Sequence, residues 1–155
     1  MEVLERVLVV LTTAATPVVE LRGAIPVGLA LGLTPWQAWV WSVLGNLLPV
    51  PALLLGTRTG LGWLGRLPWV HKRIRVWGER SSSRLATQVR RWGLLGLAVF
   101  VAIPLPGTGA WTGAVAASLL GIKPGPALAA IALGVAVAGL LVAGAGTAAV
   151  TLGQG

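Results

Sequence analysis

Apolar residues form long and short runs along this chain. A helix needs about 20 apolar residues to cross a hydrocarbon core roughly 30 Å thick. Residues 36–56 and 124–149 reach that length, although Pro49 and Pro51 should kink the first of these runs. We therefore predict two transmembrane helices, together with shorter helices where the apolar runs cannot cross, at residues 3–16, 24–33, 94–103 and 114–120.

The short runs come in pairs, and each pair precedes a long run. Pro17, Glu20 and Arg22 separate the first pair, and the segment "PLPGTGAWTG", residues 104–113, separates the second pair. Non-helical backbone at membrane depth is tolerated only where it is buried in protein or lines a water-filled cavity. Each pair therefore predicts a re-entrant helical hairpin that is followed by a transmembrane helix.

Prolines within the hairpins predict where the chain turns. We expect Pro26 and Pro104 to lie at or near the hairpin breaks, with residues 107–109 close to the bilayer centre. The helix after the first break should begin near Ala24, and the helix after the second break near Trp111. Both helices would then direct the positive end of their dipole toward the break.

The two halves of the sequence align at a constant offset of 89 residues. The matches fall at the breaks and at the helix starts, which favours an internal duplication within a single membrane domain, residues 1–155. We expect a first repeat at residues 1–57, a linker at 58–92 and a second repeat at 93–149. The matching positions are Pro17 with Pro106, Leu31 and Gly32 with Leu120 and Gly121, Pro35 with Pro124, Ala38 with Ala127, and Leu44 and Gly45 with Leu133 and Gly134.

A hairpin returns the chain to the side from which it entered, whereas a transmembrane helix carries it across. Because each repeat holds one hairpin and one crossing, the two repeats should be inverted relative to one another. Many secondary transporters have inverted repeats, with a substrate site near the bilayer midplane. We therefore predict an all-α integral membrane protein with an inverted repeat.

Charge predicts the orientation of this protein in the membrane. The chain has twelve Lys and Arg residues against four Asp and Glu residues, a formal net charge of +8. Most of the basic residues lie in the linker, which is typical of a cytoplasmic loop and not of a nucleic-acid-binding surface. We expect a multi-pass protein of the cell (inner) membrane with both termini external. The basic residues of the linker are Arg58, Arg66, Lys72, Arg73, Arg75, Arg80, Arg84, Arg90 and Arg91.

The linker also carries apolar residues at near-helical spacing, which predicts amphipathic helices on the inner leaflet. We interpret His71, the only histidine, as a residue of this loop. The apolar positions are Trp69, Ile74, Trp77, Leu85, Val89 and Trp92.

Composition argues against an enzyme. Apolar residues make up 55% of the chain and charged residues 10%, and cysteine is absent. The mean hydropathy is +0.85. The sequence has no phosphate-binding loop, zinc-protease helix or nucleophile elbow. We expect no catalytic residues, no metal site and no cofactor.

Glu20 and Arg22 are the residues most suggestive of function. Ionisable groups at membrane depth cost at least a few kcal/mol each, so they normally face a cavity or a partner. The pair is either a structural ion pair or part of a site. In the second case Arg22 binds an anion through its planar guanidinium, and Glu20 is its counter-charge or a carboxylate whose proton exchange is coupled to transport.

The second hairpin has no charge at the matching positions and would contribute backbone groups and hydroxyls. Gly107, Thr108, Gly109 and Thr112 could direct N–H and O–H groups into the break, toward a phosphate or a carboxylate. The alternative is a tight turn with close helix packing. Trp111 is either a lid or a packing residue.

We interpret Asn46 as the one strong polar group in the first long run. Its amide either bonds carbonyls that Pro49 and Pro51 leave without a helical donor, or it lines the substrate site.

Three ordered motifs resemble a known family. "ELRGAIPVGLALG", "GNLLPVP" and "FVAIPLPGTGAWTGAVAASLLG" together look like the signature of the bacterial and archaeal small multidrug export proteins. That family is similar in architecture to the DedA/SNARE-associated membrane proteins. The resemblance implies two re-entrant hairpins and, through the DedA proteins, a link to polyprenyl-phosphate lipids.

These observations predict a small secondary transporter or lipid flippase with a midplane site between the hairpins. The substrate would be an amphipathic anion such as a polyprenyl-phosphate lipid. The alternatives are an exporter of lipophilic cationic drugs and a non-transporting membrane scaffold. We expect a homodimer, because two crossings and two hairpins enclose little cavity.

Overall fold

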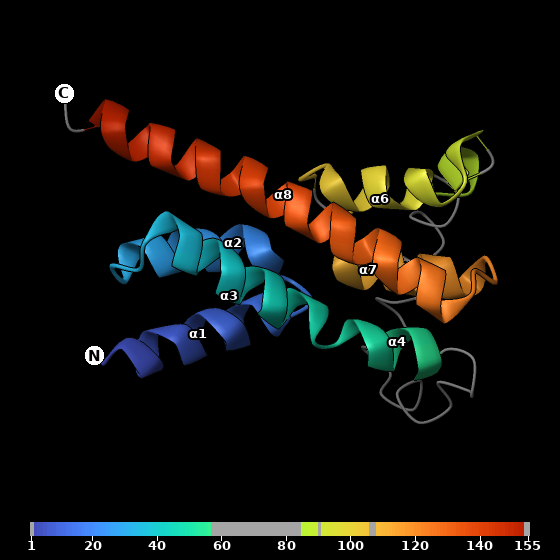
Figure 1. The fold of residues 1–155 in the computed structure, drawn as a ribbon, viewed down its shortest axis with the longest axis horizontal. Helices are drawn as coiled ribbons and strands as arrows, with labels where there is room; N and C mark the ends of the chain where they lie inside the picture. Colours follow the sequence, from blue (N-terminus) through green and yellow to red (C-terminus); the bar gives the residue numbers. More distant parts are fainter. Residues whose placement is uncertain (1, 57–84, 90, 106–107, 154–155) are drawn as a thin grey trace. The chain divides into compact units, whose positions relative to one another are not determined.

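The computed structural model describes residues 2–56, 85–89, 91–105 and 108–153, and these residues form helices joined by turns (Figure 1). The described part contains no strand, so the predicted all-helical fold is confirmed. The helices are α1 (Val3–Ala15), α2 (Glu20–Ala30), α3 (Pro35–Leu47), α4 (Val50–Gly56), α6 (Leu94–Ala102), α7 (Ala110–Leu119) and α8 (Pro124–Gly153).

Two helical segments are long and apolar enough to cross a membrane, as the sequence predicts. They are Pro35–Leu55, with 21 residues and a mean hydropathy of 1.6, and Pro124–Gly146, with 23 residues and a mean hydropathy of 2.4. The first is interrupted between α3 and α4, where Pro49 cannot donate a helical hydrogen bond. We predicted a kink at Pro49 and Pro51, and the interruption lies at the first of these prolines, whereas Pro51 lies inside α4.

The chain divides into two compact units, and α8 contributes to both. The first unit consists of Met1–Leu48 and Val135–Gly155, and the second of Pro49–Gly134. The first unit contains the hairpin of α1 and α2, helix α3 and the second part of α8. The second unit contains α4, the hairpin of α6 and α7 and the first part of α8.

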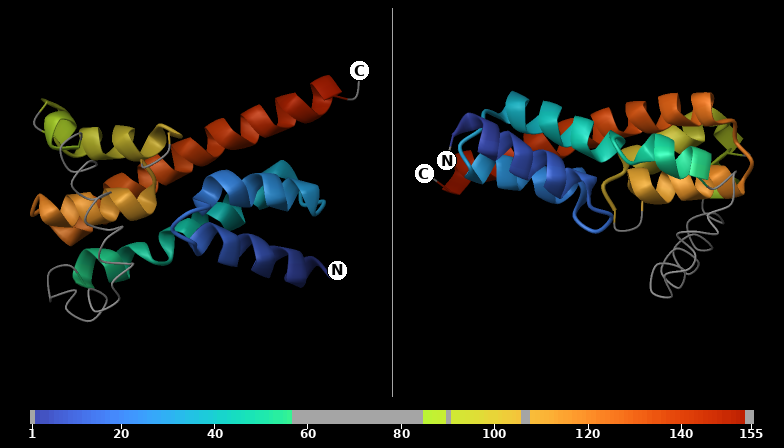
Figure 2. Two further views of the ribbon diagram at one scale, coloured as in Figure 1. Left: turned by 180° about the vertical axis from the view of Figure 1, so that it is seen from behind. Right: turned by 90° about the horizontal axis from the view of Figure 1, so that it is seen from below.

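In the first unit, α1 and α2 form a hairpin that packs against α3 (Figures 1 and 2). Small residues allow this close approach. A Cβ atom on Gly45 would lie 2.5 Å from the Leu11 carbonyl oxygen, and one on Gly28 would lie 3.0 Å from the Ala38 Cβ. Helix α3 begins with a capping box, in which Thr34 Oγ1 accepts a hydrogen bond from the Gln37 N–H.

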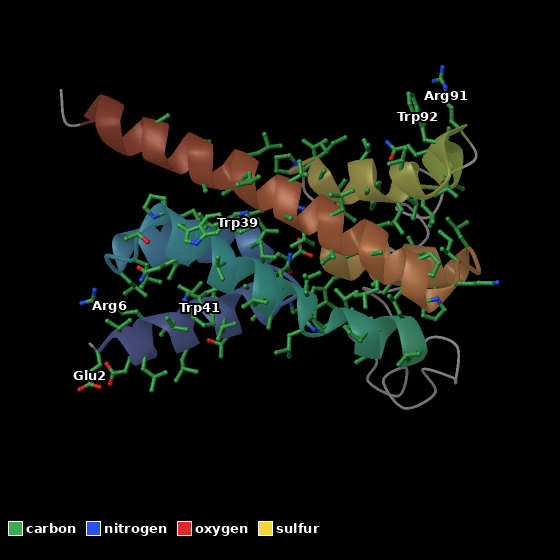
Figure 3. The ribbon with its side chains drawn as sticks, in the orientation of Figure 1. Glu2, Arg6, Trp39, Trp41, Arg91 and Trp92 are labelled. Carbon is green, nitrogen blue, oxygen red and sulfur yellow. The ribbon has the colours of Figure 1, made fainter. Side chains whose placement is uncertain are left out.

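The C-terminal part of α8 packs on another side of α3 within the same unit. The Trp39 indole N–H donates a hydrogen bond of 3.1 Å to the Ala136 carbonyl oxygen. Gly139 faces Trp39 and Val43, and an added Cβ would lie 2.7 Å from the Trp39 ring. Figure 3 labels Trp39 on α3.

In the second unit, α6 and α7 form a hairpin, and α4 lies against α7. Glycines again mark the close contacts. A Cβ on Gly113 would lie 2.7 Å from Val101 Cγ2, and one on Gly134 would lie 2.6 Å from the Ala98 carbonyl oxygen.

The turn after the hairpin is the same in both units. Gly32 and Gly121 have left-handed φ angles of 82° and 70°. The backbone hydrogen bonds around them recur at the offset of 89 residues that the sequence shows, and they end α2 and α7 in the manner of a Schellman motif. In the first unit, the N–H groups of Leu31, Gly32 and Leu33 donate to the carbonyl oxygens of Val27, Leu29 and Gly28, respectively. In the second unit, the N–H groups of Leu120, Gly121 and Ile122 donate to the carbonyl oxygens of Ala116, Ser118 and Ala117, respectively.

The first hairpin break differs from our expectation. The chain turns at residues 16–19, α2 begins at Glu20 and not near Ala24, and Pro26 lies inside α2. The end of α1 agrees with the predicted helix 3–16, because the residue before a proline is held in an extended conformation and Thr16 (φ −78°, ψ 141°) ends α1 in front of Pro17. A single proline inside an apolar helix removes only one hydrogen bond and is tolerated.

The second break agrees with the prediction. Pro104 lies between α6 and α7, and α7 begins at Ala110, one residue before Trp111. Most of the linker, including His71 and the predicted amphipathic positions before Leu85, falls outside the described residues.

Candidate functional site

Glu20 and Arg22 lie at the tip of the first hairpin. Arg22 Nη2 is 3.5 Å from Glu20 Oε2, so the two side chains form an ion pair. The Glu20 side chain is 9% exposed and the Arg22 side chain 25% exposed. The pair is therefore largely withdrawn from the surface, with part of the guanidinium still accessible.

The backbone at Glu20 explains how residues two apart can pair. On a regular helix, side chains at i and i+2 do not face one another. Glu20 has a φ of +51°, and within the described part of the chain it is the only residue besides glycine with a positive φ. This left-handed conformation costs a non-glycine residue about 1–2 kcal/mol. Unusual backbone of this kind clusters at functional sites.

The hairpin tip lies level with the middle of the first apolar segment. Helices α2 and α3 are antiparallel neighbours, and Gly28 contacts Ala38. Glu20 is eight residues from Gly28 along α2, and Asn46 is eight residues from Ala38 along α3, both in the direction of the hairpin tip. Each separation is about 12 Å along its helix, so Glu20 and Asn46 lie at the same level. Gly45, beside Asn46, is the middle residue of Pro35–Leu55.

Two buried polar side chains lie on α3 near this level. Ser42 and Asn46 are both 0% exposed. The Ser42 hydroxyl oxygen and both polar atoms of the Asn46 amide have no hydrogen-bond partner in the described structure. The amide therefore does not bond a carbonyl freed by Pro49 or Pro51, which was the structural alternative for Asn46.

Sequence reasoning identified Asn46 but missed Ser42. Serine is common on helices and carries little information alone. The spacing could have identified it, because Ser42 precedes Asn46 by four positions and residues four apart lie on one face of a helix.

The second hairpin uses its hydroxyl groups locally. Thr108 Oγ1 lies within hydrogen-bond distance of the Ile103 and Leu105 carbonyl oxygens, at 2.5 and 2.8 Å, and accepts from the Leu105 N–H at 3.2 Å. Thr112 Oγ1 donates to the Gly109 carbonyl at 3.0 Å. These bonds stabilise the turn and the start of α7, so they fit the tight-turn alternative.

The remaining predicted residues of this hairpin are placed in part. Gly109 is the N-cap of α7, and Trp111 is half-buried on its first turn. Gly107 falls outside the described residues. A role in substrate binding stays a prediction for Gly107, Thr108, Gly109, Trp111 and Thr112, and so does a site shared by both hairpins.

The four polar residues described above align with apolar residues or glycine in the second half of the chain. At the offset of 89 residues, Glu20, Arg22, Ser42 and Asn46 correspond to Gly109, Trp111, Ile131 and Val135. The backbone at the two hairpin breaks also differs, because Glu20 has a φ of +51° whereas Gly109 has a φ of −88°. The charged pair and the left-handed residue therefore belong to the first hairpin and not to the second.

Comparison with known families gives one match. The model of a family described as "Putative small multi-drug export protein" matches residues 20–141, a range that begins at the buried glutamate and includes α2 through most of α8. No curated protein and no solved structure matches the chain. Among the described residues, no group of three His, Cys, Asp or Glu side chains could hold a metal ion.

Proposed function

This chain belongs to the family of small multi-drug export proteins, and we propose that it transports an amphipathic molecule with an anionic head group. The family and the two long apolar helices support a membrane protein with an export or transport function. The head group, the site and the mechanism that follow are our proposal.

The observation that carries the proposal is the Glu20–Arg22 pair. Its two charges are held at a hairpin tip, and Glu20 adopts a strained backbone conformation there. The second half of the chain has Gly109 and Trp111 at the matching positions, so its hairpin break carries neither charge, and Gly109 has an ordinary φ of −88°. An arginine binds phosphate or carboxylate through two parallel hydrogen bonds, which a lysine cannot do.

A re-entrant geometry is supported by the length of the hairpin. Helix α1 has 13 residues, about 20 Å, and therefore cannot cross a hydrocarbon core of about 30 Å. The tip that it reaches is level with the centre of the apolar segment Pro35–Leu55. A charged pair at that level would lie near the bilayer midplane, where transporters of inverted-repeat architecture bind their substrates.

An inverted repeat is supported by the recurrence of the same hydrogen bonds at an offset of 89 residues. Two hairpins and two crossings would then leave both termini on one side, with the basic linker on the cytoplasmic side. We further propose a homodimer, since so small a chain encloses little cavity.

A second candidate is the export of lipophilic cations, which the family description favours. In that case Glu20 would bind the cation and Arg22 would hold the carboxylate in the empty state. A scaffold without transport activity would instead keep the two side chains bound to one another permanently.

Reconstituted vesicles distinguish these candidates. We expect the wild-type protein to accelerate the transbilayer movement of a fluorescent polyprenyl phosphate and to leave ethidium uptake unchanged. Arg22→Gln should abolish the movement of the phosphate, whereas Thr12→Val, on the exposed face of α1, should not change it. Arg22-independent ethidium transport would indicate the cation exporter, and movement of neither probe would indicate the scaffold.

A further inference from the structure

Ser42 and Asn46 form a buried polar pair that the Glu20–Arg22 site does not use. They lie four residues apart on one face of α3, and both are fully buried. Their hydroxyl and amide groups make no hydrogen bond in the described structure, so none joins them to Glu20 or Arg22.

The position of Asn46 follows from its spacing along α3. Trp39, Val43 and Asn46 are related as i, i+4 and i+7, so they lie on one stripe of the helix. Gly139 of α8 packs against the first two of these residues. Asn46 therefore lies on the same stripe of α3 as the two residues that Gly139 contacts.

An unpaired polar group in such a place is unfavourable, because it has lost water without gaining a partner. Native proteins contain few such groups, and each one calls for an explanation. A requirement of the fold does not explain these two, because Ile131 and Val135 are buried at the equivalent positions of the second repeat. A bound group that is absent from the protein chain does explain them.

The chemistry of the pair indicates the kind of group. An anion would satisfy the Ser42 hydroxyl and the Asn46 N–H groups but leave the amide oxygen unpaired. A cation would satisfy the two oxygens but leave the amide N–H groups unpaired. A neutral group that both donates and accepts hydrogen bonds satisfies all of them.

We propose that Ser42 and Asn46 form a neutral hydrogen-bonding subsite that binds a hydroxyl or amide of the transported molecule. The inference rests on the proposed transport function and narrows its substrate to amphiphiles with such a group in the head. Water has the same hydrogen-bonding chemistry, and the experiment separates water from the substrate group.

The test uses purified protein in phosphatidylcholine nanodiscs and three amphiphiles with the same alkyl chain. Octyl glucoside offers hydroxyls, octyl phosphate offers an anion, and octyltrimethylammonium offers neither donor nor acceptor. Each is titrated below its micelle concentration while the midpoint of thermal unfolding is recorded. The variants are Ser42→Ala, Asn46→Val and Arg22→Gln, and Thr12→Val is the matched control for loss of a hydroxyl.

We expect octyl glucoside to raise the unfolding midpoint of the wild type saturably. Asn46→Val and Ser42→Ala should each raise the octyl glucoside concentration that gives half of this effect by about two- to tenfold, the loss expected for one hydrogen bond. Thr12→Val should respond like the wild type. An equal response of the wild type and Asn46→Val would overturn the proposal. So would a wild type without response, which would leave water as the occupant.

Stability without ligand provides a second measurement. Asn46→Val should unfold at the same temperature as the wild type or at a higher one, because it removes unpaired buried groups and introduces the residue found at position 135. A clearly lower midpoint would show that the amide stabilises the fold, and it would contradict the subsite.

The octyl phosphate titrations separate this inference from the proposed function. Arg22→Gln should lose the phosphate response and keep the glucoside response. If no protein responds to the phosphate while the glucoside response depends on Asn46, the anionic head group is wrong and the subsite stands. If the phosphate response depends on Arg22 but the glucoside response does not depend on Asn46, the proposed function stands and the subsite is wrong.

Discussion

At the scale of single residues, the Glu20–Arg22 ion pair is the feature that any proposed function has to account for. We expect Arg22→Lys to restore transport only in part, because an ammonium keeps the charge but loses the flat, forked donor geometry. The initial rate of polyprenyl phosphate movement in vesicles measures this effect. Transport by the lysine variant at the wild-type rate would show that charge alone is sufficient.

The double variant Glu20→Gln with Arg22→Gln separates a functional pair from a structural one. Glu20→Gln alone leaves Arg22 without its counter-charge and should lower stability, by less than the 3–5 kcal/mol of a fully buried pair since Arg22 is partly exposed. The double variant should recover that stability and remain inactive. Thermal unfolding and vesicle transport together decide the matter, and an active double variant would make the pair structural.

At the scale of helices and turns, the two glycines with left-handed backbone should behave alike. Gly32→Ala and Gly121→Ala should each destabilise the protein by about 1 kcal/mol, since a Cβ disfavours positive φ. Gly144→Ala is the control, because its surroundings are open and it lies within α8. The control should be neutral or stabilising in the same thermal unfolding measurement, and equal losses in all three variants would refute the argument from φ.

The helix contacts of the two units should also be sensitive to an added methyl group. Gly45→Ala and Gly134→Ala would place a Cβ 2.5 and 2.6 Å from backbone carbonyl oxygens, which cannot move aside as a side chain can. We expect losses of about 1–3 kcal/mol, the usual effect of overpacking. Chemical denaturation in detergent would show it, and a loss no larger than that of Gly144→Ala would argue against this packing.

At the scale of the whole molecule, the proposed topology makes a direct prediction. A reporter fused at Ser82 should be cytoplasmic, and reporters at both termini should be external, because basic loops remain on the cytoplasmic side. Paired reporters of opposite compartment preference provide the measurement. Termini on opposite sides of the membrane would remove the basis for the inverted repeat.

The sequence by itself determined those features that depend on local covalent chemistry or on run length. The helical class, the two long apolar segments and the break at Pro49 follow from hydropathy and from the missing proline N–H. The positions of the second hairpin break and of the start of α7 were predicted for the same reason.

Only the tertiary structure decided which polar groups are buried and which of them are paired. Helix α2 begins at Glu20 and continues through Pro26, whereas the sequence predicted a start near Ala24 and a break near Pro26. Thr108 and Thr112 bond their own turn, whereas Ser42 and Asn46 remain without partners. Hydrogen bonding and burial depend on which residues distant in the sequence lie side by side, and a linear pattern of residues does not contain that information.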